Sequence, residues 1–169
     1  KPVEITAATK QPDWTWYATG PGAGIQTRAG RLVVPCDHIS TADAAWGSHV
    51  IYSDDHGQTW KLGGTAGPKV NECEVAELAD GRLMLNMRNY NRQHACRAVA
   101  ISRDGGLTWS ELRYDEALVE PVCQASLRRL STVEDGGQNR LVFSNPAEIG
   151  QRKELTLRLS HDEGQTWPV

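Results

Sequence analysis

The stretch from Val70 to Arg92 contains two residues of opposite charge whose spacing could support chemistry, Glu72 and Arg88. A carboxylate can accept a proton, and a guanidinium can bind an anion through charge-assisted hydrogen bonds. The stretch reads as a β-hairpin, because two apolar-rich runs reverse at Ala79-Asp80-Gly81-Arg82 and Asp-Gly is a strong turn signal. The turn brings Glu72, early in the first run, level with Arg88, late in the second.

The length of the turn decides whether these two side chains share a face of the hairpin. A two-residue loop would put Glu72 and Arg88 on opposite faces. A three-residue loop with Gly81 in the left-handed conformation pairs Glu72 with Arg88, and it pairs Glu74 with Asn86. This second register also gathers five apolar side chains on the other face: Cys73, Val75, Leu83, Leu85 and Met87. Since a one-residue slip moves every side chain across the sheet, the apolar grouping favours the three-residue loop.

Three copies of an eight-residue pattern, S-x-D-x-G-x-T-W, indicate the fold that must position these charges. They span residues 53–60, 102–109 and 160–167, and a strand-like run precedes each copy. In a tight turn the Asp can accept hydrogen bonds from backbone N–H groups, and the Gly supplies the positive φ that the turn requires. We expect a structural role for the conserved members of the pattern: Ser53, Asp55, Gly57, Trp60, Ser102, Asp104, Gly106, Trp109, Ser160, Asp162, Gly164 and Trp167.

The rest of the chain alternates short strand-like runs with turn residues, and no helix signal exceeds a turn or two. We therefore expect an all-β chain of roughly three four-stranded β-propeller blades, over approximately 20–62, 69–112 and 121–169, with no separate second domain. Propellers need roughly four to eight blades to close a ring. The sequence thus predicts a partial propeller, completed by the rest of a larger propeller or by a second copy.

Composition excludes several classes of protein. The chain has 169 residues and a formal net charge of -3 without a dense basic block, which argues against a nucleic-acid partner. No apolar run approaches the roughly 20 residues needed to span a bilayer. The four cysteines, at 36, 73, 96 and 123, are too widely spread to indicate a zinc site or a disulfide framework, so we expect small buried hydrophobes. No metal or other cofactor is expected, and the sequence leaves the cellular compartment open.

The eight-residue pattern is the Asp-box, or BNR repeat, and the chain resembles the non-viral exo-α-sialidases (neuraminidases). Four motifs carry the resemblance in order along the chain: Gly20-Pro21-Gly22-x-Gly24-Ile25-Gln26, Asn71-Glu72-Cys73, Leu85-Asn86-x-Arg88, and Asn145-Pro146 with Arg152. The resemblance covers essentially the whole chain and corresponds to the middle of a six-bladed catalytic propeller. It implies that the boxes join the last two strands of a blade, far from the catalytic face, although their carboxylates and hydroxyls look like active-site groups.

The resemblance implies an enzyme that hydrolyses terminal sialic acids from glycoconjugates. In that family three arginines clamp the substrate carboxylate, a tyrosine attacks the anomeric carbon, a glutamate is its base and an aspartate is the acid/base. The chemistry is reasonable, because an anionic sugar would repel a carboxylate nucleophile, whereas a neutral phenol avoids that repulsion until a base removes its proton.

Position by position, Glu72 matches the catalytic base, Arg88 the second arginine and Arg152 the third. Gln124 and Asp37 are weaker matches to substrate-facing polar groups. Other interpretations remain open for these residues. Glu72 could be only a salt-bridge partner of Arg88, Arg152 a solvated loop cation, and Gln124 a hydrogen-bonding core amide.

The chain also departs from the family pattern. The first arginine and the acid/base aspartate have no match in residues 1–30, and the nucleophilic tyrosine is expected beyond Val169. Tyr17, Tyr52, Tyr90 and Tyr114 do not occupy its place, so we expect the isolated chain to be inactive. Three other functions stay open: a trans-sialidase with the same site, a non-catalytic Asp-box module that binds glycans or protein, and a self-assembling half-propeller.

Overall fold

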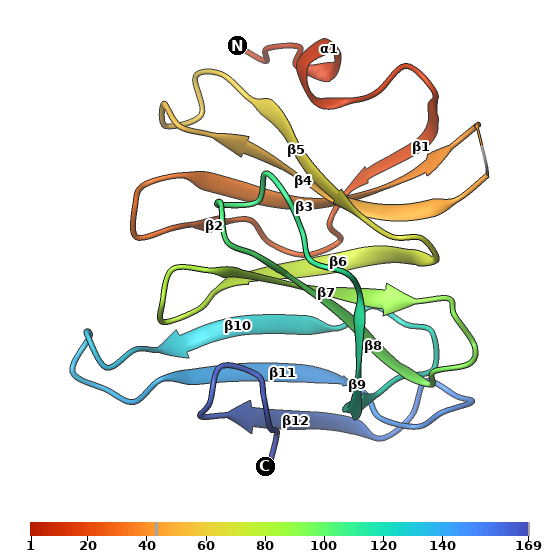
Figure 1. Ribbon diagram of the computed structural model, residues 1–169, viewed down its shortest axis with the longest axis vertical. Coiled ribbons are helices and arrows are strands. Elements are labelled where there is room, and N and C mark those ends of the chain that lie inside the picture. The colour runs from red at the N-terminus through yellow and green to blue at the C-terminus, as the bar shows by residue number, and fades with distance from the viewer. Residues whose placement is uncertain (43, 169) are drawn as a thin grey trace.

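The computed structural model describes residues 1–42 and 44–168, and its regular structure is almost entirely β (Figure 1). One short helix, α1 (Thr6–Thr9), precedes the strands. The strands are β1 (Trp14–Thr19), β2 (Ile25–Gln26), β3 (Leu32–Ser40), β4 (Trp46–Ser53), β5 (Lys61–Ala66), β6 (Val70–Glu77), β7 (Leu83–Asn89), β8 (Cys96–Ser102), β9 (Arg113–Val119), β10 (Ser126–Ser131), β11 (Arg140–Pro146) and β12 (Leu155–Ser160). The all-β class expected from the sequence is confirmed. No helix in the described residues is long and apolar enough to cross a membrane.

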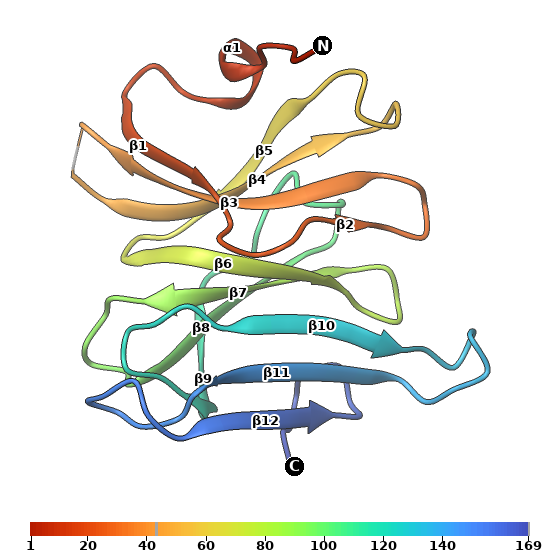
Figure 2. The ribbon, with the colours of Figure 1, turned by 180° about the vertical axis from the view of Figure 1, so that it is seen from behind.

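The strands form three antiparallel sheets that follow one another along the molecule (Figures 1 and 2). The first has the order β1-β3-β4-β5 with β2 also paired to β3, the second β6-β7-β8-β9, and the third β10-β11-β12. Three strands extend past the approximate ranges expected from the sequence. β1 pairs with β3 ahead of residue 20, β5 runs past residue 62 and β9 begins after residue 112. The sheets therefore include the strand that follows each of the first two boxes.

Two apolar layers hold the three sheets together. Residues from the first and second sheets form one layer, among them Val33, Val50, Val75 and Leu85. The other lies between the second and third sheets and includes Phe143. The second sheet is thus covered on both faces, which explains why β7 and β8 are buried almost throughout.

From Cys73 to Glu77 the β6–β7 hairpin has the register that the apolar grouping favoured, and the pairing shifts by one residue between Val70 and Cys73. Glu74 pairs with Asn86, and the Leu78 N–H donates to the Arg82 carbonyl across a three-residue loop at 2.8 Å. Gly81 in that loop has φ +85°, the left-handed conformation that glycine adopts without steric cost. All five side chains assigned to the other face lie in the first apolar layer: Cys73, Val75, Leu83, Leu85 and Met87. Cys36, Cys73 and Cys96 are buried free thiols, as expected, and Cys123 is partly buried.

The three boxes repeat one hydrogen-bond pattern. In the second box, the Ser102 hydroxyl donates to Asp104 Oδ1 at 2.7 Å and accepts from the Gly106 N–H at 2.8 Å. Asp104 also accepts from the Thr108 N–H at 2.9 Å and the Thr108 hydroxyl at 2.6 Å. The first and third boxes make the equivalent bonds. The Asp side chains are therefore fully used in closing turns.

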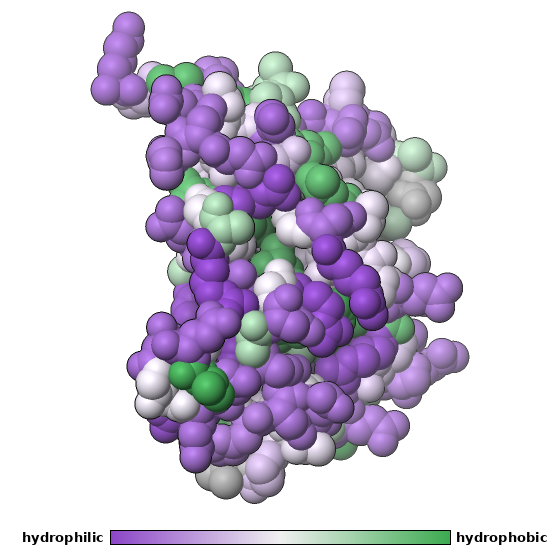
Figure 3. All heavy atoms as spheres, turned by 60° about the vertical axis from the view of Figure 1, so that its left-hand side comes forward, coloured by the Kyte–Doolittle hydropathy of each residue, from purple (hydrophilic) through white to green (hydrophobic). Residues whose placement is uncertain are grey.

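Strand direction separates the boxes from the charged end of the hairpin. The boxes follow β4, β8 and β12 and lie toward the left in Figure 1, on what we call the box edge. Because neighbouring strands are antiparallel, the start of β6 and the end of β7 lie on the opposite edge. This loop edge carries segments 67–69, 90–95, 120–125 and 147–154. The molecule turned to bring the box side forward has a mostly hydrophilic surface with scattered apolar residues (Figure 3).

Alanine substitutions at the box glycines test this account of the turns. Gly57, Gly106 and Gly164 all have positive φ, which costs an alanine about 1–2 kcal/mol. A Cβ at Gly57 would have 3.7 Å of room, but at Gly106 it would come within 3.0 Å of Val50 and at Gly164 within 2.7 Å of Met84. We expect Gly106→Ala and Gly164→Ala to lower the unfolding free energy by more than Gly57→Ala does, measured by urea denaturation.

Gly30→Ala is the control for this series. Gly30 has φ +92°, and a Cβ there would meet nothing within 4 Å. The Gly30→Ala variant should therefore lose only the unfolding free energy that the positive φ costs an alanine. Equal losses in all four variants would mean that the packing of the boxes against the sheets contributes nothing.

Candidate functional site

The charged end of the hairpin forms an ion pair on the loop edge. Arg88 Nη1 donates to Glu72 Oε2 at 2.7 Å, so the two side chains point the same way, as the register predicted. The Glu72 side chain is 24% exposed and that of Arg88 17%, so both remain within reach of a ligand. A purely structural salt bridge would make the same contact. The contact therefore fixes how the two side chains lie relative to each other.

Asp37 lies next to this pair and is almost completely buried. Its Oδ1 accepts hydrogen bonds from Trp16 Nε1 and Asn71 Nδ2, each at 2.8 Å. Burial, together with the negative charge of nearby Glu72, raises the pKa of Asp37 to about 6, although the two donors and the charge of Arg88 act in the opposite direction. The bond from Asn71 joins β3 of the first sheet to the residue before Glu72. The site thus brings together two carboxyl groups from neighbouring sheets.

Aromatic rings line the Arg88 side of the site. The guanidinium carbon of Arg88 lies 4.9 Å from the ring centroid of Tyr90, and Trp46 stacks on Tyr90 at 5.5 Å. Arg88 Nε is buried and has no hydrogen-bond partner among the described residues. The Tyr90 ring supports the guanidinium through a cation–π contact, and the partly exposed guanidinium could bind an anionic group.

Gln124 connects the segment before β10 to the glycine-rich loop at 20–24. Its Nε2 donates to the Pro21 carbonyl at 2.8 Å, and its Oε1 is buried without a partner in the described structure. The loop also packs against Glu74, since a Cβ on Gly22 would lie 2.3 Å from Glu74 Oε1. Gln124 therefore makes the bond of a core amide and still has an unused acceptor.

Arg152 lies on the loop edge but apart from the ion pair. It belongs to segment 147–154 between β11 and β12, is exposed, and makes no ion pair or side-chain hydrogen bond within residues 1–42 and 44–168. Of the residues singled out in the sequence, the structure thus brings Glu72, Arg88 and Asp37 together. Gln124 and Arg152 share the same edge.

The four tyrosines do not contact the candidate base. Tyr17 is partly buried beside His49, and Tyr52 lies on the box side under Arg31. Tyr114 bonds to Asn91, and Tyr90 packs against Trp46. No tyrosine among the described residues donates a hydrogen bond to Glu72. Sequence reasoning had missed Trp16, Trp46 and the stacking of Tyr90, because no motif links these aromatic residues to their partners.

The raised pKa of Asp37 predicts a pH-dependent stability. An unfolded aspartate ionises near a pKa of about 3.9, before the folded one does. The folded state therefore loses stability, by roughly 1–3 kcal/mol, as the pH rises from about 4 to about 6. Asp37→Asn keeps an oxygen that accepts from Trp16 and Asn71, and this part of the pH slope should vanish in urea unfolding. An unchanged slope in the variant would contradict the assignment.

Comparison with known proteins places these observations in a family. The family model described as "BNR repeat-like domain" matches residues 4–169. A sialidase from Bacteroides fragilis is 39% identical over 98% of this chain, and one from Micromonospora viridifaciens is 40% identical over 98%. The solved structure of Hadza microbial sialidase Hz136 superimposes with a TM-score of 0.89 at 40% identity over 98% of the chain.

The chain spans only part of each of these relatives. It covers 30% of the Bacteroides fragilis protein, 26% of the Micromonospora viridifaciens protein and 32% of the Hz136 chain. The chain belongs to the BNR repeat-like domain family and has the sheet structure of a sialidase β-propeller.

Proposed function

We propose that this chain supplies part of the active site of an exo-α-sialidase. In this proposal Glu72 is the base that activates a tyrosine from outside the 169 residues. Arg88 and Arg152 bind the carboxylate of a terminal sialic acid on a glycoconjugate. The observation that carries the proposal is the Glu72–Arg88 pair on the loop edge, whose side chains are both partly exposed. The similarity to named sialidases supports it.

The geometry of the pair suits this division of roles. Arg88 holds one oxygen of Glu72, Oε2, so the carboxylate is oriented and Oε1 remains available to accept a proton. A guanidinium matches a carboxylate ligand through parallel charge-assisted hydrogen bonds, and the guanidinium carbon of Arg88 lies over the Tyr90 ring at 4.9 Å. Binding and proton transfer would therefore use different atoms of one ion pair.

Asp37, Gln124 and Arg152 would complete the substrate side in different ways. Asp37 is too buried to contact much of a ligand, so its main effect would be on the charge around Glu72. Gln124 Oε1 is unpaired but buried, so a movement of the side chain would have to bring it to a substrate hydroxyl or amide N–H. Arg152, exposed in segment 147–154, would need that segment to bring its guanidinium toward Arg88.

Binding without turnover is the second candidate function. It is favoured by one observation, that no described tyrosine contacts Glu72. Arg88 could still attract a carboxylate, although an exposed pair of charges contributes only about 0–1 kcal/mol in water. A glycan-binding module would therefore be weak.

Substitutions at the ion pair test the catalytic proposal in the complete protein that contains this chain. With a fluorogenic sialoside, Glu72→Gln should lower kcat by about 10²–10⁴-fold with little change in KM, because it removes a general base. Arg88→Lys should raise KM, because an ammonium cannot form the paired bonds. Glu77→Gln is a matched control on the same strand, since Glu77 pairs with Arg28 on the box edge. Equal losses in Glu72→Gln and Glu77→Gln would reject a catalytic role for Glu72.

The isolated 169-residue chain should show no turnover of the same sialoside. The described tyrosines do not reach Glu72, and loss of members of a catalytic unit costs several orders of magnitude in rate. Calorimetric titration with sialic acid would measure any binding that remains. Turnover that disappears in Glu72→Gln would show that the missing groups come from a second copy.

A further inference from the structure

A second ion pair, Arg97 with Glu120, is completely buried just behind the candidate site. Arg97 Nη1 donates to Glu120 Oε2 at 2.8 Å, and the side chains are 0% and 1% exposed. Burying two charges is costly unless their remaining hydrogen-bonding groups are also satisfied. The partners of this pair therefore indicate what it holds in place.

Arg97 holds two segments that carry candidate site residues. From β8 its Nε donates to Asn86 Oδ1 at 2.7 Å, two residues before Arg88 on β7. Its Nη1 also donates to the Cys123 carbonyl at 2.7 Å, next to Gln124. One guanidinium thus fixes β7 relative to the segment 120–125.

Glu120 holds the end of β7 from the other side. Its Oε1 accepts from the Asn89 N–H at 2.6 Å, directly after Arg88. The Asn89 side chain then donates to the carbonyls of His94 at 3.0 Å and Cys96 at 2.9 Å. These bonds close segment 90–95, which begins with Tyr90, the ring on which Arg88 lies.

We infer that Arg97 and Glu120 are positioning residues for the anion-binding side of the site. Their bonds surround Arg88 at Asn86 and Asn89, and they also anchor Tyr90 and Gln124 through the neighbouring backbone. Neither charged group is exposed to a ligand, and the burial removes solvent screening from the pair. The inference rests on the proposed role of Arg88 in binding a substrate carboxylate.

Glu120→Gln tests the inference in the complete protein that contains this chain. Glutamine keeps the size of the side chain and an acceptor for Asn89, but it leaves the Arg97 charge buried and unpaired. We expect KM for the sialoside to rise about tenfold or more with a smaller change in kcat, because a displacement of about 1 Å in a binding group can cost 10²-fold. Unchanged KM would overturn the inference.

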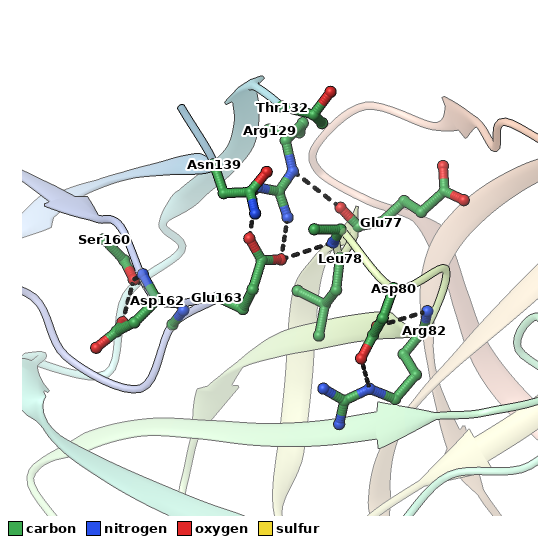
Figure 4. Close-up of polar contacts among 12 residues, drawn as sticks. Glu77, Leu78, Asp80, Arg82, Arg129, Thr132, Asn139, Ser160, Asp162 and Glu163 are labelled. Atoms are coloured by element: carbon green, nitrogen blue, oxygen red, sulfur yellow. Dashed lines mark hydrogen bonds and ion pairs between the residues drawn. The ribbon is translucent and has the colours of Figure 1, made fainter. Parts of the chain in front are cut away.

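The ion pair between Arg129 and Glu163 provides a matched control (Figure 4). It also ties a β-hairpin to its neighbour, because Glu163 Oε2 accepts from the Ala79 N–H at 2.8 Å, but it lies on the box edge. Glu163→Gln should lower stability and leave KM within about twofold, since distant sites act independently. If it raises KM as much as Glu120→Gln at a similar loss of stability, the effect is general destabilisation and the inference is wrong.

A double variant covers the case in which Glu120→Gln does not fold. Arg97→Met with Glu120→Leu leaves no lone buried charge, and such replacements often preserve stability. It still removes the bonds to Asn86, Asn89 and Cys123, so we expect a folded protein with raised KM. It should also show faster amide hydrogen exchange at Asn89 and through segment 90–95. Wild-type exchange and wild-type KM in this variant would overturn the inference.

The exchange measurement separates this inference from the proposed function. If the wild-type protein does not turn over sialosides, the proposed function fails. Faster exchange at Asn89 in the double variant would then still support anchoring of the β7 end by the buried pair. If exchange in the double variant becomes faster only at residues outside 86–96 and 120–125, that anchoring is rejected.

Discussion

The register of the β6–β7 hairpin is the constraint on which the rest of the structure depends. Gly81, in the left-handed conformation, closes a three-residue loop, and this loop sets which residues of β6 face which residues of β7. One register serves two purposes. It sends the apolar set of the hairpin into the layer against the first sheet, and it places Glu72 and Arg88 2.7 Å apart on the loop edge. A slip of one residue would remove both the apolar contacts with the first sheet and the contact between Glu72 and Arg88.

The two edges of the sheets use charged groups in opposite ways. On the box edge the Asp side chains accept hydrogen bonds within the turns. These bonds lower the pKa of Asp55 to about 2. Glu163 of the third box forms an ion pair with Arg129 and accepts a hydrogen bond from the Ala79 N–H. On the loop edge Arg88 Nε and Gln124 Oε1 are buried and have no partner among the described residues. Unused polar groups cost stability, so these two atoms are physically consistent with a ligand site on this edge.

Burial on the loop edge also distinguishes two kinds of carboxylate. Glu120 is paired with Arg97 and accepts from a backbone N–H, so its charge is compensated. Asp37 has only neutral donors, Trp16 and Asn71, and lies near Glu72, so the folded state disfavours its charged form. The first arrangement orders backbone around Arg88, and the second adjusts the charge next to Glu72. Both lie behind the exposed pair, where a ligand would not reach them.

The sequence by itself determined the β class, the three box turns, and the pairing of Glu72 with Arg88. These features are local, because a turn signal, a glycine position and an alternating apolar pattern lie within a few residues of one another. Only the tertiary structure decided that Asp37 lies beside this pair, that Trp46 stacks on Tyr90, and that Arg97 binds Glu120. Asp37 is 34 residues from its partner Asn71, and Trp46 is 44 residues from Tyr90; both contacts join the first sheet to the second. Arg97 and Glu120 are 23 residues apart and meet because β8 pairs with β9 within the second sheet. A charged residue such as Arg97 within a buried strand carries no local sign of its partner, since the partner depends on which strands pair and in which register.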